Sequence, residues 1–239
     1  MQKISCRQGV ADTPHAWIYY KDHGGRGTPL VMLHGNAETH RVFKYYEKQL
    51  SGTYRTILMD SRAHGRSKMK PAYAKREFTI ADMAEDVAVL LDTLHIKSCI
   101  LLGFSDGANI ALEFASRFPE RTISVIAVSG NISPDGLIFP LQLFSSVKYT
   151  LLKAVNGFFS QHLFRQQQLA SLLCNSPMMT KADLQKIKAP VLLIAGTRDV
   201  VKVSHSRRME RLIPHARLVL VKGATHTSMF AREKEYLKM

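Results

Sequence analysis

The feature that most constrains this chain is a serine between two glycines, in the pentapeptide Gly-Phe-Ser-Asp-Gly at residues 103–107. The apolar run at 99–102 predicts a buried strand before it, and the apolar spacing over 107–118 predicts a helix that Pro119 ends. So sharp a turn forces the serine at its tip into a strained backbone conformation, and its neighbours two positions away must lack side-chain bulk. The pattern therefore predicts a nucleophile elbow that presents the Ser105 hydroxyl at a helix N-terminus.

Further apolar runs, each followed by a loop or a helical pattern, recur along the chain. Predicted strands lie at 16–21, 29–33, 56–59, 123–128, 190–195 and 216–221, with a weaker one within 1–10. The clearest helix begins at Thr79, which forms a capping-box-like start with Asp82. Buried strands that alternate with helices favour an α/β fold, a mostly parallel sheet covered on both faces. We expect residues 1–239 to form a single domain.

One stretch, at about 131–188, interrupts this alternation. It lies between two predicted core strands and contains no Asp or Glu between Asp135 and Asp183. Its apolar side chains are Leu137, Phe139, Leu141, Phe144, Val147, Leu151, Leu152, Phe158, Phe159 and Phe164. Because it follows the strand after the elbow helix, we interpret it as a helical lid insertion over the strand ends. The alternative is an ordinary helical layer that only completes the core.

Composition narrows the classes of function. The formal net charge is +14, but the 33 Lys and Arg residues are scattered and form no run of five, so we expect no nucleic-acid partner. A nucleic-acid or membrane-surface binder is kept as a rival hypothesis, suggested by this charge and the acid-free insertion. No apolar run approaches the roughly 18 residues of a membrane span, and the N-terminus lacks the apolar core of a signal peptide. We expect a cytoplasmic protein without integral membrane association.

The three cysteines, Cys6, Cys99 and Cys174, have no C-x-x-C spacing. Such a sparse and odd-numbered set favours free thiols in a reducing compartment over a disulfide framework or a zinc site.

A serine nucleophile needs a general base and an acid that orients it. His226, just past the last predicted strand, is the preferred base, with His205 and His215 as alternatives. Asp199 directly follows the 190–195 strand and is the preferred acid, with Asp135 as the fallback. Ser105, Asp199 and His226 all follow strands and so share the carboxyl edge of the sheet, where open α/β sheets build their sites.

The chain resembles the α/β-hydrolase superfamily over nearly its whole length. The matching segments are 34–36 (His-Gly-Asn), 60–67, the elbow, 196–199 and 223–226, all in the expected order. The resemblance implies an eight-stranded core sheet, a lid at the insertion, and backbone N–H groups of Asn36 and Asp106 that bind an oxyanion. Ala63 departs from the family pattern, which commonly has glycine at that position.

The residue types at the elbow narrow the resemblance further. Dehalogenases and epoxide hydrolases of this superfamily carry an aspartate where this chain has Ser105. The Ser105-Asp106 pair is similar to the esterases of the biphenyl-hydrolase-like group, the group of valacyclovir hydrolase. That resemblance implies that the Asp106 carboxylate binds a substrate amine, whereas the alternative is that only its backbone matters.

The sequence thus predicts a serine hydrolase that cleaves a carboxylic ester, or a related acyl bond, of a small molecule through an acyl-enzyme. This chemistry needs no metal and no organic cofactor. A thioesterase, a C–C bond hydrolase or an acyltransferase could use the same residues, and a non-catalytic protein of the same fold could bind a small ligand. The oligomeric state is left open by the sequence.

Overall fold

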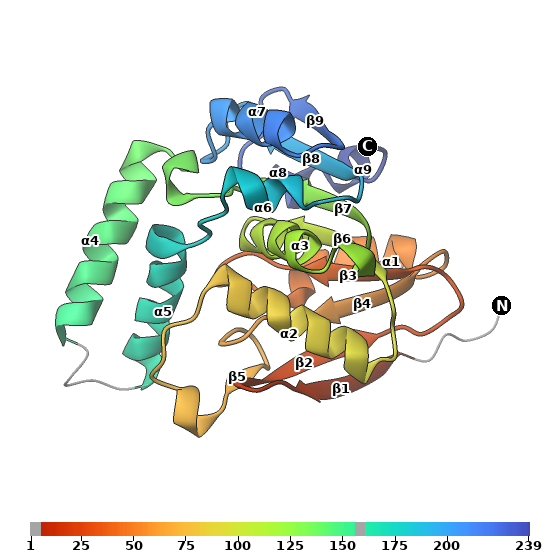
Figure 1. The fold of residues 1–239 in the computed structure, drawn as a ribbon, viewed down its shortest axis with the longest axis horizontal. Helices are drawn as coiled ribbons and strands as arrows, with labels where there is room; N and C mark the ends of the chain where they lie inside the picture. The colour runs from red at the N-terminus through yellow and green to blue at the C-terminus, as the bar shows by residue number, and fades with distance from the viewer. Residues whose placement is uncertain (1–5, 156–160) are drawn as a thin grey trace.

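The computed structural model describes residues 6–155 and 161–239 and is built around one sheet (Figure 1). The strand order is β1-β2-β4-β3-β6-β7-β8-β9, and the short β5 pairs with β2 outside this path. The neighbours from β4 to β9 are parallel, whereas β2 is antiparallel to β1, β4 and β5. The strands are β1 (Arg7–Asp12), β2 (Ala16–Asp22), β3 (Pro29–Leu33), β4 (Arg55–Met59), β5 (Lys68–Met69), β6 (Cys99–Phe104), β7 (Thr122–Val128), β8 (Val191–Gly196) and β9 (Ala216–Val221). The mostly parallel sheet is confirmed, with β5 added to the eight strands that the resemblance implied.

Helices follow most of the parallel strands. They are α1 (Lys44–Leu50), α2 (Ile80–Thr93), α3 (Asp106–Arg117), α4 (Phe139–Val155), α5 (Gln161–Asn175), α6 (Lys181–Gln185), α7 (Val203–Leu212), α8 (Ser228–Ala231) and α9 (Glu233–Tyr236). Short 3-10 turns are η1 (His40–Phe43), η2 (Pro71–Tyr73), η3 (Pro119–Arg121) and η4 (Pro134–Gly136). The predicted capping box at the start of α2 is present, because Thr79 and Asp82 exchange side-chain and backbone hydrogen bonds.

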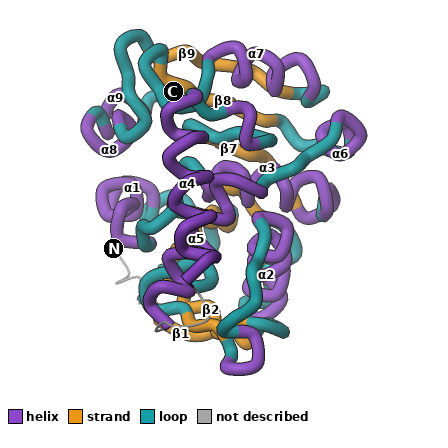
Figure 2. The backbone as a smooth tube through the Cα atoms, turned by 90° about the vertical axis from the view of Figure 1, so that its left-hand side faces the viewer, coloured by secondary structure: helices purple, strands orange, loops and turns teal. Residues whose placement is uncertain are grey.

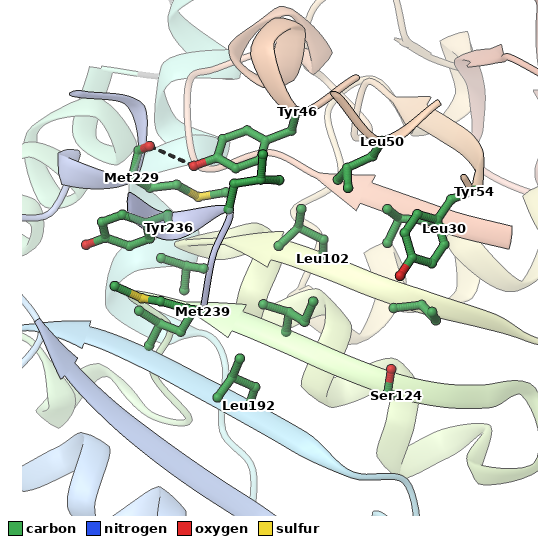
Figure 3. Close-up of a pocket in the computed structure, with 15 residues that line it drawn as sticks. Leu30, Tyr46, Leu50, Tyr54, Leu102, Ser124, Leu192, Met229, Tyr236 and Met239 are labelled. Atoms are coloured by element: carbon green, nitrogen blue, oxygen red, sulfur yellow. Dashed lines mark hydrogen bonds between the residues drawn. The ribbon is translucent and has the colours of Figure 1, made fainter. Parts of the chain in front are cut away.

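Both faces of the sheet are covered, which explains the continuous apolar strands. In β3, Val31 and Leu33 pack on one face and Leu30 and Met32 on the other. The first face is covered by α2, α3, α6 and α7, and the second by α1, α8 and α9. The second face also holds a cavity of about 280 Å³ whose lining includes Leu30, Leu102, Ser124, Leu192 and Tyr236 (Figure 3).

The insertion between β7 and β8 divides into two parts. Helices α4 and α5 stand beside the body of the domain, with α4 outermost (Figures 1 and 2). The stretch from Pro177 onward does not belong to that pair, because Leu184 of α6 and Ile187 are fully buried in the core. The helical nature of the insertion agrees with the prediction, but its last part is the ordinary core layer that was the alternative. Phe158 and Phe159 lie outside the described residues.

Within the described residues, no helix is both long and apolar enough to cross a membrane.

The turn between β6 and α3 is as tight as the sequence predicts. Ser105 has φ of 54° and ψ of −121°, a conformation that residues with a side chain rarely adopt. A Cβ at Gly103 would lie 2.2 Å from the Gly107 oxygen, and a Cβ at Gly107 would lie 1.9 Å from the Leu33 oxygen. The two glycines therefore allow the elbow helix to approach β6 and β3 closely.

Two buried histidines hold the loop after β3 against the loop after β4. His34 Nε2 accepts the Ser61 N–H at 3.0 Å, and His64 Nε2 accepts the Ala37 N–H at 3.1 Å. Their Nδ1 atoms lie 2.8 Å from backbone carbonyls, so each ring is a neutral donor and acceptor. Burial lowers the pKa of His34 to about 4 and that of His64 to about 3. In the loop after β4, Ala63 adopts φ 59°, a left-handed conformation, at the position where the family pattern has glycine.

We expect Gly103→Ala to destabilise the fold by more than about 3 kcal/mol, because the new methyl group would overlap backbone that cannot move away. Gly52→Ala is the matched control, since a Cβ there meets nothing within 4 Å. The measurement is the free energy of unfolding in urea. Equal stability of the two variants would contradict the close approach of α3 to β6.

The neutral histidines also predict a pH dependence of stability. Their folded pKa values lie below the ordinary value of 6.5, so between 6.5 and about 4 the unfolded chain binds more protons. Stability is therefore complete above 6.5 and falls as the pH falls, by about 2 kcal/mol per histidine at pH 5. His64→Gln, which keeps an acceptor for Ala37, should flatten this dependence in urea titrations, whereas the exposed control His215→Gln should not. Identical pH profiles for all three proteins would contradict the assignment.

Candidate active site

The four segments that carry the predicted site residues meet at the carboxyl edge of the sheet. Asn36 follows β3, Ser105 follows β6, Asp199 follows β8, and His226 follows β9. Strand β3 has β4 as its neighbour on one side and β6 as its neighbour on the other, so the strand order changes direction at β3. Loops leave this switch point in opposite directions, which opens a crevice where α/β sheets bind ligands.

Ser105, His226 and Asp199 form one hydrogen-bonded row. His226 Nε2 lies 3.0 Å from Ser105 Oγ, and His226 Nδ1 lies 2.7 Å from Asp199 Oδ1. The Asp199 side chain is fully buried, whereas the His226 side chain is 25% exposed. A carboxylate at Nδ1 fixes the tautomer that leaves Nε2 free to accept a proton from the serine.

The Asp199 carboxylate is held by more than the histidine. Its Oδ2 accepts the Ser129 hydroxyl at 2.6 Å, and its Oδ1 accepts the Val201 N–H at 3.1 Å. Burial alone would raise the pKa of Asp199, but these hydrogen bonds and the one from His226 outweigh burial and lower it. Sequence reasoning missed Ser129. Its position directly after β7 at the same sheet edge was a usable signal.

The alternative site residues lie elsewhere. His205 is buried in α7, where its Nε2 accepts the Ile132 N–H at 3.1 Å. His215 is exposed and precedes β9, at the opposite edge of the sheet from His226. Asp135 is exposed and pairs with Arg208 at 3.4 Å. The structure therefore brings only the preferred base and acid to Ser105. In the described part of the chain, no group of three or more His, Cys, Asp and Glu side chains could hold a metal ion.

The loop after β3 lies directly against the elbow. A Cβ at Gly35 would be 3.1 Å from the Ser105 Cβ, so the Asn36 backbone begins next to the serine. Asp106 is the first residue of α3, and the N–H groups of a first helical turn have no partner within the helix. Among the described residues, neither the Asn36 N–H nor the Asp106 N–H donates to a protein acceptor. Both are thus free to bind an anion at the positive end of α3.

The side chains of the same two residues bind each other. Asn36 Nδ2 donates to Asp106 Oδ2 at 2.9 Å and to the Leu169 carbonyl of α5 at 3.0 Å. Asp106 is only 4% exposed, and burial raises the pKa of its carboxyl more than the Asn36 hydrogen bond lowers it. Glu38, which the sequence did not single out, accepts the Gly35 N–H at 3.0 Å, and burial raises its pKa as well. Two carboxyl groups thus flank the loop that carries Asn36.

A pocket of about 90 Å³ lies between this loop and helices α4 and α5. Asn36 and Ala37 of the loop after β3 are part of its lining. Its other lining residues are Leu141, Phe144, Ser145, Lys148, Gln166, Leu169, Ala170 and Leu173. Most of this lining is apolar, so the pocket suits an apolar group more than a charged one.

Comparisons with known proteins agree with the fold. A model of the α/β hydrolase fold family matches residues 28–162, more than half of the chain. The chain is 26% identical to the pimeloyl-[acyl-carrier protein] methyl ester esterase of Aeromonas hydrophila, over 90% of this chain and 94% of that protein. It is 25% identical to the AB hydrolase superfamily protein YisY of Bacillus subtilis, with 92% of each covered.

The fold is also that of solved hydrolases. A carboxylesterase structure from the thaumarchaeon Nitrososphaera gargenis superposes with a TM-score of 0.79 at 21% identity, covering 96% of this chain and 95% of the other. The relatives named here include an esterase and a superfamily hydrolase, which supports an enzyme with a hydrolytic function. The chain belongs to the α/β hydrolase fold family.

Proposed function

We propose that this chain is a serine hydrolase that cleaves a carboxylic ester of a small molecule through an acyl-enzyme. The observation that carries the proposal is the hydrogen-bonded row in which His226 joins Ser105 at 3.0 Å and Asp199 at 2.7 Å. A serine hydroxyl is a poor nucleophile at neutral pH unless an adjacent base removes its proton. The row supplies that base and the carboxylate that orients it.

The geometry suggests a route for each proton. Ser105 Oγ attacks the ester carbon while His226 Nε2 takes the hydroxyl proton, and Asp199 stabilises the resulting imidazolium. The carbonyl oxygen becomes an oxyanion, to which the N–H groups of Asn36 and Asp106 donate. His226 then gives its proton to the alcohol oxygen as the C–O bond breaks. A water repeats the cycle on the acyl-serine, so acid and free Ser105 are released.

The pocket between α4 and α5 would take the acyl part of the substrate. It begins at Asn36 and Ala37, beside the proposed oxyanion site, and continues along Leu141, Leu169 and Leu173. Apolar contacts there favour a hydrocarbon acyl group. A screen of esters, thioesters, lactones and amides would identify the bond that is cleaved fastest.

Ser105→Ala should abolish hydrolysis of p-nitrophenyl esters, with a loss of kcat of about a million-fold. A fluorophosphonate probe should label the native protein at Ser105, as read by peptide mass spectrometry. Ser204→Ala, which alters an exposed serine on α7, is the control and should keep full activity and labelling. Turnover that survives Ser105→Ala would rule out this mechanism in favour of another nucleophile. Absence of both turnover and labelling in the unmodified protein would instead favour the non-catalytic alternative.

The Asp106 side chain carries a second proposal, that its carboxylate binds a substrate amine. Its burial and its hydrogen bond to Asn36 favour a different role, in which it positions the loop that carries the Asn36 N–H. A side chain with this role would be needed for every substrate, whereas an amine ligand would matter only for amino-acid esters.

Asp106→Asn separates these roles. If the carboxylate positions Asn36, kcat should fall about tenfold on amino-acid esters and uncharged esters alike, the loss expected for one hydrogen bond to a charged group. A rise in KM confined to amino-acid esters would instead support the amine contact. Steady-state kinetics on matched pairs of esters measures both, and equal losses on both would exclude the amine contact.

A further inference from the structure

Helix α4 turns its apolar side toward solvent. Phe139 is 68% exposed, Leu143 52%, Phe144 66%, Val147 49% and Leu151 63%. At the helical period these five side chains cover one arc of roughly 140°. Figure 2 shows α4 in front of α5 and the rest of the domain. The exposure of the five side chains places the arc on the solvent side of α4. Large exposed side chains grouped on one surface mark an interaction site more often than scattered ones do.

The opposite side of α4 is polar and faces the protein. The Gln142 amide donates to the carbonyls of Pro134 and Leu137, and Ser145 is buried. The Tyr149 hydroxyl donates to Glu77. Helix α5 buries both kinds of side chain. Gln167 and Gln168 donate to residues before α2, whereas Leu169 and Leu172 pack into the core. The amphipathic pattern of α4 is thus the reverse of that of a helix that only covers a core.

The surface around the arc is cationic. Between Asp135 and Asp183 the sequence has no acidic residue, and its basic residues are Lys148, Lys153, Arg165 and Lys181. Lys148 and Lys153 border the arc on its two sides by helical spacing. Their ammonium groups donate to Gln166 at 3.3 Å and to Tyr149 at 3.4 Å, and in the described chain neither pairs with a carboxylate. Both lysines keep their charge available to an anionic partner.

We propose that the outer face of α4 docks on an anionic lipid surface. An apolar arc bordered by lysines is the arrangement of helices that lie in a membrane interface, with apolar side chains in the acyl region and ammonium groups at the headgroups. The convex ridge of a single helix fits such a surface. The absence of acidic side chains on this segment selects an anionic surface over a neutral one.

The docking face and the candidate site meet at Phe144. This side chain belongs to the exposed arc and also lines the pocket that ends at Asn36. With α4 on a lipid surface, the pocket between α4 and α5 would lie next to the membrane. The proposal concerns binding and stands independently of the proposed ester hydrolysis.

The test is flotation of the full chain with vesicles of phosphatidylcholine, alone or mixed with phosphatidylglycerol, at physiological salt. We expect binding to the mixed vesicles and little to the neutral ones. Leu143→Ser/Val147→Ser/Leu151→Ser should weaken binding by more than tenfold, because it removes the apolar arc. Val10→Ser/Ile123→Ser, which alters exposed apolar side chains on β1 and β7, is the matched control and should bind as the unmodified chain does.

The lysines are tested in the same assay. Lys148→Gln/Lys153→Gln should lower affinity for the mixed vesicles by about fivefold per lysine, and high salt should remove this difference. Lys48→Gln/Lys234→Gln makes the same change of charge on α1 and α9, away from α4, and should have a much smaller effect.

A tryptophan on the arc keeps the test valid if the serine variant does not fold. In a Trp17→Phe background, Leu143→Trp supplies a single tryptophan whose emission should shift to the blue when mixed vesicles are added. Absence of binding and of this shift would overturn the proposal. Self-association of the chain that is lost in the Leu143→Ser/Val147→Ser/Leu151→Ser variant, without vesicle binding, would assign the face to a second copy instead.

Discussion

The site depends on how closely the backbone of β3, β6 and the first turn of α3 can approach one another. At Gly103 and Gly107 even a methyl group would overlap backbone atoms, at 2.2 Å and 1.9 Å. Ser105 sits between them at φ 54°, and the turn is held because its N–H donates to the Val128 carbonyl at 2.9 Å. The strain is thus maintained by the packing of neighbouring strands. The same approach places the Asn36 loop beside the serine.

The features that could be predicted from the sequence are those that depend on residues close together in the chain, such as strand bounds and helix caps. The strands at 29–33 and 216–221 were predicted to the residue. In β3 the reason is burial on both faces, which gives a continuous apolar run, whereas in the edge strand β9 it is the apolar run Leu218–Val221. The capping box between Thr79 and Asp82 was also predictable, because both residues lie within one helical turn. The site residues that directly follow strands were predictable for the same reason, since their place depends on the end of the adjacent strand. Ser129 was missed because its partner, Asp199, lies in another segment and leaves no periodic trace. Glu38 was missed because its contact with the Gly35 N–H, within one loop, belongs to no periodic pattern. The stretch around α6 was assigned to the lid, since a helix of five residues with one buried leucine looks the same in sequence in a lid or in a core.

Asn36 connects the proposed oxyanion site to the insertion. Its side chain joins Asp106 at the elbow to the Leu169 carbonyl of α5. On its other side, His64 holds the neighbouring Ala37 N–H. The loop is therefore fixed by the elbow helix, by the loop after β4 and by α5. A displacement of α5 would act on Asn36 through its side-chain amide, so two hydrogen bonds of that amide connect the position of α5 to the proposed oxyanion donors.

The arrangement of α4 and α5 separates stability from function. In α5, Leu169 and Leu172 pack into the core, as expected of a helix that covers it. The pattern of α4 is different, because Phe139 and Leu151 are exposed while Gln142 donates to backbone carbonyls of the protein. Exposed apolar area contributes nothing to folding but does contribute to binding wherever it is covered. Since Phe144 belongs both to that area and to the lining of the pocket at Asn36, whatever covers α4 also borders that pocket.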